Sequence, residues 1–170
     1  MFSDQGAWFG YSFPDTISSY GGFSGPFLMT QQNGVWSSAN FAQLILNNVV
    51  WNSIETKSYN SHLEQTFKNE NLELSQQLFF SSGHTAIINS TITNIGEKTL
   101  AISMHWKNRP IAADGLKLAA AANEVTIHST KSNAIGHLLF QTGTSIKSTD
   151  SSYLTESEHI SLKPNQSKEI

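Results

Sequence analysis

The chain has 170 residues, of which 14% are charged, and its formal net charge is -3. A chain of this length usually forms one domain that buries about 70% of its unfolded surface, so we expect residues 1–170 to be a single domain. Lys and Arg together number only ten, which disfavours a nucleic-acid partner because phosphate binding depends on clustered basic side chains.

Cysteine is absent, so disulfides and thiolate chemistry are excluded. The sequence contains no apolar run of about 18 residues, which argues against a membrane-spanning helix. Met1 leads directly into Phe2-Ser3-Asp4, without the basic and apolar regions of a secretory signal. If the parent protein is exported, we expect its signal peptide to lie outside this sequence.

The first thirty residues interleave glycines with aromatic residues. Ordinary strands contain little glycine, because it costs backbone entropy and packs no side chain. The glycines at positions 21, 22 and 25 are not followed by a phosphate-binding GK[ST] signature. We therefore predict tight turns at Gly21, Gly22 and Gly25 that let two chain segments pass closely.

We call residues 1–30 the leader. Three of its residues, together with Gly22, are candidates for a functional surface. Aromatic rings stack on the apolar faces of sugars but also fill sandwich cores, so Trp8 and Phe23 have both interpretations. The glycines on either side of Trp8 indicate close approach of another backbone. Asp15 follows a proline, a pair that favours a turn, where its carboxylate either caps the turn or binds sugar hydroxyls.

Two pairs of strand-like segments follow. Residues 27–31 and 41–46 bracket the turn-forming pair Asn33-Gly34. Residues 59–67 and 72–80 flank a polar tip, which predicts an antiparallel hairpin.

The middle of the chain alternates with the period of two that is expected of half-buried strands. Leu100, Ile102, Met104 and Trp106 share one face, and residues 86–92 alternate in the same way. The intervening Asn-Ile-Gly-Glu at 94–97 tolerates positive φ. We predict that the two segments pair as an antiparallel hairpin.

The last third of the chain contains more short strands. We predict them at residues 125–129, 134–140 and 159–162. Residues 116–122 contain four alanines and predict either one helical turn or a strand of small residues. The chain ends on a strand, a turn and the start of another strand, as expected if the sequence was cut from a longer protein and exposes a sheet edge.

Short strands at near-regular spacing, with no long helical periods between them, indicate an all-β fold. The class that we predict is a two-sheet antiparallel β-sandwich of the super-sandwich type, with at most one or two short helical turns.

The leader closely resembles the start of the amino-terminal β-sandwich domain of bacterial glucosidases in glycoside hydrolase family 63. The residues that carry the resemblance are Phe2, Gly6-Ala7-Trp8, Gly10, Pro14-Asp15, Gly21-Gly22-Phe23, Gly25, Thr30, Ala39-Asn40-Phe41 and Leu44. Weaker similarity continues through Tyr59, Leu63, Gln65, Leu78-Phe79, Ile88 and Thr91-Ile92-Thr93, so it covers about the first hundred residues.

The resemblance implies a non-catalytic domain that precedes an (α/α)6 barrel, and this barrel would carry both catalytic carboxyl groups of an inverting α-glucosidase. It also implies a periplasmic or secreted location. On this hypothesis the chain packs against its own catalytic barrel, and Trp8, Asp15, Gly22 and Phe23 shape the substrate pocket or the interface. The alternative is a free-standing carbohydrate-binding module, in which Trp8 and Phe23 form an exposed platform for an oligosaccharide.

An intact small hydrolase is the weakest hypothesis. Glycoside hydrolysis needs two opposed carboxyl groups, one of them held protonated by its surroundings. The four aspartates (Asp4, Asp15, Asp114 and Asp150) and the glutamates stand mostly in polar contexts typical of solvated surface groups. The six histidines lack metal-ligand spacing, so we predict no catalytic residue, metal or cofactor.

Overall fold

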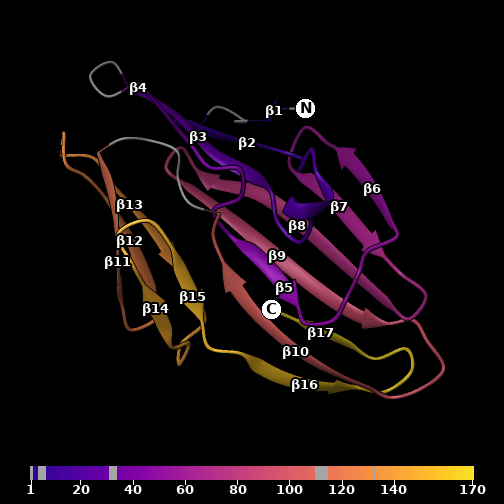
Figure 1. Cartoon of the computed structure of the whole chain (residues 1–170). Helices are drawn as coiled ribbons and strands as arrows, with labels where there is room; N and C mark the ends of the chain where they lie inside the picture. Colours follow the sequence, from indigo (N-terminus) through magenta and orange to yellow (C-terminus); the bar gives the residue numbers. More distant parts are fainter. Residues whose placement is uncertain (1, 4–6, 31–33, 110–114, 132) are drawn as a thin grey trace.

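The computed structural model describes residues 2–3, 7–30, 34–109, 115–131 and 133–170. These residues are nearly all in antiparallel β-strands and the loops between them (Figure 1), which confirms the predicted fold class. Helical structure in the described part is limited to one 3-10 turn, η1 (Ile17–Ser19). No helix among the described residues is long and apolar enough to cross a membrane.

One layer of the sandwich is a five-stranded sheet with the order β17-β9-β8-β7-β6. Its strands are β6 (Ser53–Ser58), β7 (Leu63–Lys68), β8 (Leu72–Ser82), β9 (Thr85–Asn94) and β17 (Ser167–Glu169). Strands β6 to β9 form a meander in which each strand pairs with the next along the chain. Burial alternates along β7 and β8, so one face of the sheet points into the core.

The opposing layer is built around β10, which pairs with β5 on one edge and with β15 and β16 on the other. Its strands are β5 (Gln43–Leu46), β10 (Leu100–Lys107), β14 (Ile146–Ser148), β15 (Tyr153–Thr155) and β16 (Glu158–Leu162). Figure 1 shows β5 and β10 next to β9 of the first layer, with β16 beyond β10.

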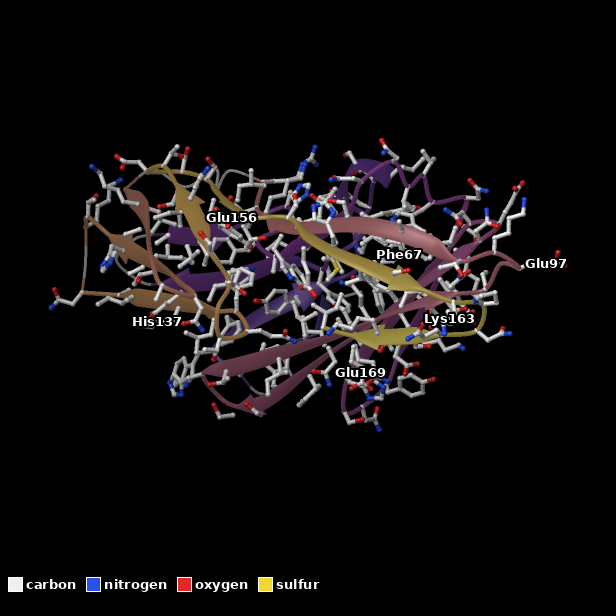
Figure 2. All side chains as sticks on the ribbon, turned by 90° about the horizontal axis from the view of Figure 1, so that it is seen from below. Phe67, Glu97, His137, Glu156, Lys163 and Glu169 are labelled. Atoms are coloured by element: carbon white, nitrogen blue, oxygen red, sulfur yellow. The ribbon has the colours of Figure 1, made fainter. Side chains whose placement is uncertain are left out.

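The main core lies between these two layers. Phe67, labelled in Figure 2, is fully buried at its centre. The buried members of this core come from β5, β7, β8, β9, β10 and β16: Leu44, Leu46, Phe67, Leu72, Leu74, Ile92, Ile102, Met104 and Leu162. Burying a side chain of this size contributes about 1.5–3 kcal/mol relative to exposure, so this core is the main source of the sandwich's stability.

Two smaller sheets extend the sandwich. The first has the order β1-β2-β3-β4 and consists of β1 (Phe2–Ser3), β2 (Phe9–Ser12), β3 (Ser24–Thr30) and β4 (Gly34–Ser37). The second consists of β11 (Leu116–Ala121), β12 (Glu124–Ser129) and β13 (Ile135–Leu139). Each has its own apolar cluster, centred on Phe23 for the first and on Val125 for the second.

Several local predictions are confirmed. Strands β7 and β8 form the hairpin expected around residues 68–71. The alanine-rich segment is a strand, β11, paired along its length with β12, so the small-residue strand is the correct alternative. The chain closes with β16, a turn and β17, and β17 is an edge strand.

The predicted hairpin between residues 86–92 and 99–106 is wrong. Strand β9 pairs with β8 and β17, whereas β10 pairs with β5, β15 and β16 in the opposite layer. The side chains of Ile92 and Ile102 therefore meet across the core. Asn94 turns the chain from one layer to the other, since its Nδ2 donates to the carbonyls of Lys98 and Leu162, each at 2.8 Å.

Residues 27–31 and 41–46, predicted to bracket the Asn33-Gly34 turn, correspond to β3 and β5, but β3 pairs with β4, which was not predicted, and β5 pairs with β10; residues 31–33 lie outside the described part. The chain continues from β4 into β5. Phe41 N donates to Gly25 O and Leu44 N donates to Gly21 O, so residues 21–25 are hydrogen-bonded to residues 41–44 at the start of β5. These bonds join the amino-terminal sheet to the layer that contains β10.

We expect Asn94→Ala to lower the free energy of unfolding by about 1–3 kcal/mol, because the carbonyls of Lys98 and Leu162 lose their donor and the bond to Leu162 is buried. The measurement is chemical denaturation of the purified chain. Asn89→Ala is the control, since Asn89 is exposed on the same strand and its loss should change stability by no more than about 0.5 kcal/mol. Equal losses in both variants would show that the turn bonds contribute nothing.

Candidate functional site

Trp8 lies on the surface, just before β2. Its backbone N–H donates to Gly83 O at 3.0 Å, so the chain passes close to the turn between β8 and β9. Its indole stacks with the ring of His84 at a centroid distance of 6.4 Å. With 73% of its surface exposed, Trp8 is one of the most exposed large apolar residues in the described part. Gly6, on its amino-terminal side, lies outside the described residues.

Aromatic contacts fasten β2 to the end of β8. The rings of Phe9 and Phe80 meet edge to face at 5.5 Å, and Tyr11 lies 6.0 Å from Phe9 and 6.3 Å from Phe80. Burial raises the pKa of the Tyr11 phenol well above its usual value, so the hydroxyl stays protonated at physiological pH. The exposed indole of Trp8 thus lies directly before a strand that is well anchored.

Phe23 and Asp15 occupy very different environments. Phe23 is 1% exposed and packs with Leu63 and Leu78, so its ring supports the leader from within the core. Asp15 is exposed in the turn before η1. Thr16 occupies the N-cap position there, and its hydroxyl contacts Ser18 and Ser19 instead of capping the helix backbone.

The Gly21-Gly22 turn lies inside the sandwich. Gly21 has φ +94°, a conformation that L side chains rarely adopt. A Cβ on Gly21 would stand 2.2 Å from Leu44 O, and one on Gly22 would stand 2.3 Å from Ala42 O. Only glycine fits at either position, which agrees with the prediction that chain segments pass closely here.

Buried amide side chains hold this turn against the five-stranded sheet. Gln65 Nε2 donates to Gly22 O at 3.0 Å, and Gln76 Nε2 donates to Gly21 O at 3.1 Å. The two glutamines are also bonded to each other, and Gln76 Nε2 contacts Ser90 Oγ at 3.0 Å. Gln65, Gln76 and Ser90 are cross-strand neighbours on β7, β8 and β9 and form a polar row across the inner face.

Two further amides hold the segment that precedes the turn. Gln43 Nε2 donates to the carbonyls of Ser18 and Tyr20, at 2.9 and 2.8 Å. Asn40 Nδ2 donates to Ser19 O at 2.7 Å. Residues 18–22 are therefore fixed by side-chain donors from three strands and from the loop before β5. This part of the leader has a defined position against the sandwich.

The roles of Gln43, Gln65 and Gln76 were not predicted from the sequence. A signal for two of them was present in the alternation of the strands. In Leu63-x-Gln65-x-Phe67 and Leu74-x-Gln76-x-Leu78 the glutamine stands at an inward position between two apolar residues. Because a buried amide needs a partner, this pattern indicates that another backbone lies above the sheet.

The carboxyl group of Glu64, on β7, is held in its ionised form. Gln77 Nε2 donates to the Glu64 carboxylate at 2.6 Å and lowers its pKa, which is the opposite of what a general acid requires. No group of three or more His, Asp or Glu side chains there is arranged to hold a metal ion. Asp4 and Asp114 lie outside the described residues.

We expect Gly22→Ala to destabilise the chain by about 1–3 kcal/mol, because the new methyl group meets a backbone oxygen that cannot move aside. In a chain of this length, thermal unfolding should then occur about 2–4 °C lower per kcal/mol lost. Gly83→Ala is the matched control, since its Cβ would meet only the Trp8 ring at 3.8 Å. An unchanged melting temperature in Gly22→Ala would contradict the geometry described for the turn.

Comparison with protein families finds a match over residues 1–138, to the family described as glucosidase YgjK, N-terminal. The matched range includes the Trp8 surface, the Gly21-Gly22 turn and the polar row beneath it. A search of curated proteins found no match. The family match covers most of the chain and agrees with the resemblance to glycoside hydrolase family 63. The chain therefore belongs to the family of the N-terminal domain of glucosidase YgjK.

Proposed function

We propose that residues 1–170 form the non-catalytic amino-terminal domain of a family 63 glucosidase and pack against a carboxyl-terminal catalytic barrel. In this arrangement residues 7–25 contribute to the mouth of the substrate pocket. The observation that carries the proposal is the contrast within this segment, where a turn fixed by buried amides supports a tryptophan that is 73% exposed. Exposed aromatic residues on a rigid support are typical of interfaces and sugar contacts.

The chemistry of the parent enzyme would come from the barrel. We propose an inverting α-glucosidase mechanism for it, with both carboxyl groups outside this chain. The polar environment of the carboxylates described above favours a supporting role for this domain. The burial of Phe23 argues against the alternative binding module that depends on Trp8 and Phe23 as one platform.

The first test is activity. We expect the purified 170-residue chain to hydrolyse no α-glucosidic bond, because the catalytic carboxyl groups belong to the barrel. Release of glucose from maltose is the measurement, with the parent enzyme as the positive control. Turnover that persists through successive purification steps would refute the non-catalytic assignment.

The second test addresses Trp8 in the parent enzyme. We expect Trp8→Ala to lower kcat/KM about tenfold or more, because an aromatic contact at the pocket or interface is lost while the fold is kept. Val50→Ala is the matched control, since Val50 is also 73% exposed but lies between β5 and β6. Wild-type kinetics in Trp8→Ala would reject the role proposed for the leader.

A further inference from the structure

A cleft opens where the edge of β10 loses its regular partner. Met104 pairs with Glu158 of β16, whereas Lys107 pairs with Leu154 of β15. His105 and Trp106 therefore face residues 155–157, which is one residue more on the partner side. This is a β-bulge, a feature that often re-aims side chains next to binding sites.

Hydrogen bonds to a side chain and to a neighbouring loop stabilise the bulge. Trp106 N donates to Thr155 Oγ1 at 2.9 Å in place of a ladder carbonyl. Glu156 N donates to Ser145 O at 2.9 Å, which draws the bulged segment toward the loop between β13 and β14. The loop itself is closed by Thr144, whose N–H and hydroxyl both donate to Gln141 O. In Figure 2, Glu156 is labelled where the chain passes from the gold strands to the yellow β16.

The cleft has a volume of about 410 Å³, within the range of roughly 300–1,000 Å³ that is typical of small-molecule sites. The rings of Trp106 and Phe140 belong to its lining, with centroids 6.1 Å apart. Thr144, Thr155, Glu156 and Glu158 are among the polar residues of the lining.

The composition of this lining selects among ligand classes. No Lys or Arg is among its residues, so a phosphate or another anion would find no compensating charge. A neutral sugar presents an apolar C–H face for an aromatic ring and hydroxyls that donate to carboxylates. Burial and the nearby Lys107 both lower the pKa of His105, so its imidazole is neutral at physiological pH and adds no positive charge.

We propose that this cleft is a binding site for a neutral saccharide, with Trp106 and Phe140 as the apolar surface and Glu156 and Glu158 as acceptors for sugar hydroxyls. The site is separate from the leader, which comes from the other end of the chain and contacts the turn between β8 and β9. The proposal stands or falls independently of the function proposed for Trp8.

The test is a two-dimensional amide NMR titration of the 170-residue chain with maltose, to about 50 mM, which covers millimolar dissociation constants. We expect saturable shifts at residues 141–145 and 155–158 and at the Trp106 indole N–H. If no saturable shift is observed, or if the shifts are confined to residues 7–25, the proposal is wrong.

Variants locate the polar contact without disturbing the core. We expect Glu156→Ala to weaken maltose binding about tenfold, because an exposed charged acceptor is removed. Glu97→Ala is the matched control and should bind as the unchanged chain does, since Glu97 is an exposed glutamate in the turn between β9 and β10 (Figure 2). Equal affinity in both variants would overturn the assignment of Glu156.

Discussion

The structure depends on a row of polar side chains in the middle of an otherwise apolar sandwich. Gln65, Gln76 and Ser90 are buried, and amides placed there cost about 1–3 kcal/mol each if they lack partners. The carbonyls of the Gly21-Gly22 turn supply partners for the Nε2 groups of the two glutamines. The turn lies between this sheet and the backbone carbonyls of Ala42 and Leu44, and only glycine fits in that space.

This row also divides the core of the first layer. On one side of it Phe67, Leu74 and Ile92 belong to the main core, and on the other side Leu63 and Leu78 pack with Phe23. Each strand thus contributes an apolar residue, a polar residue and another apolar residue to its inner face. The register is defined by this pattern, because a slip by one residue would move the amides to solvent and polar outer residues into the core.

Periodicity predicted most strands of this fold, because alternating burial leaves a direct mark on the sequence. Alternation predicted β9 and β10, and strand-like segments flanked by turn signals predicted β7, β8, β12 and β16 within a few residues. Pairing was harder to predict. The Asn-Ile-Gly-Glu segment at the end of β9 has the composition of a hairpin turn. Instead, the chain crosses there from one layer to the other, and the hydrogen bonds of Asn94 stabilise the crossing. Local turn chemistry does not distinguish the two outcomes, because the distinction lies in contacts with Leu162, far along the chain.

The candidate site was predictable only in part, for the same reason. The glycines indicated close approach, but the strands that they approach were not evident from the leader alone. The exposure of Trp8 and the burial of Phe23 follow from where β2 and the turn meet the end of β8, which sequence spacing does not encode.

The Gly21-Gly22 turn and the bulge beside β10 follow one physical rule. In both places a backbone group is satisfied by a side chain instead of a ladder partner: Gly22 O by Gln65, and Trp106 N by Thr155. Such side-chain partners keep the backbone group hydrogen-bonded where no neighbouring strand pairs with it, so the chain can leave the regular sheet. A sandwich with complete ladders presents smooth faces, so shape suited to a partner or a ligand arises where side chains take over backbone bonds. The leader and the cleft are two such places in this chain.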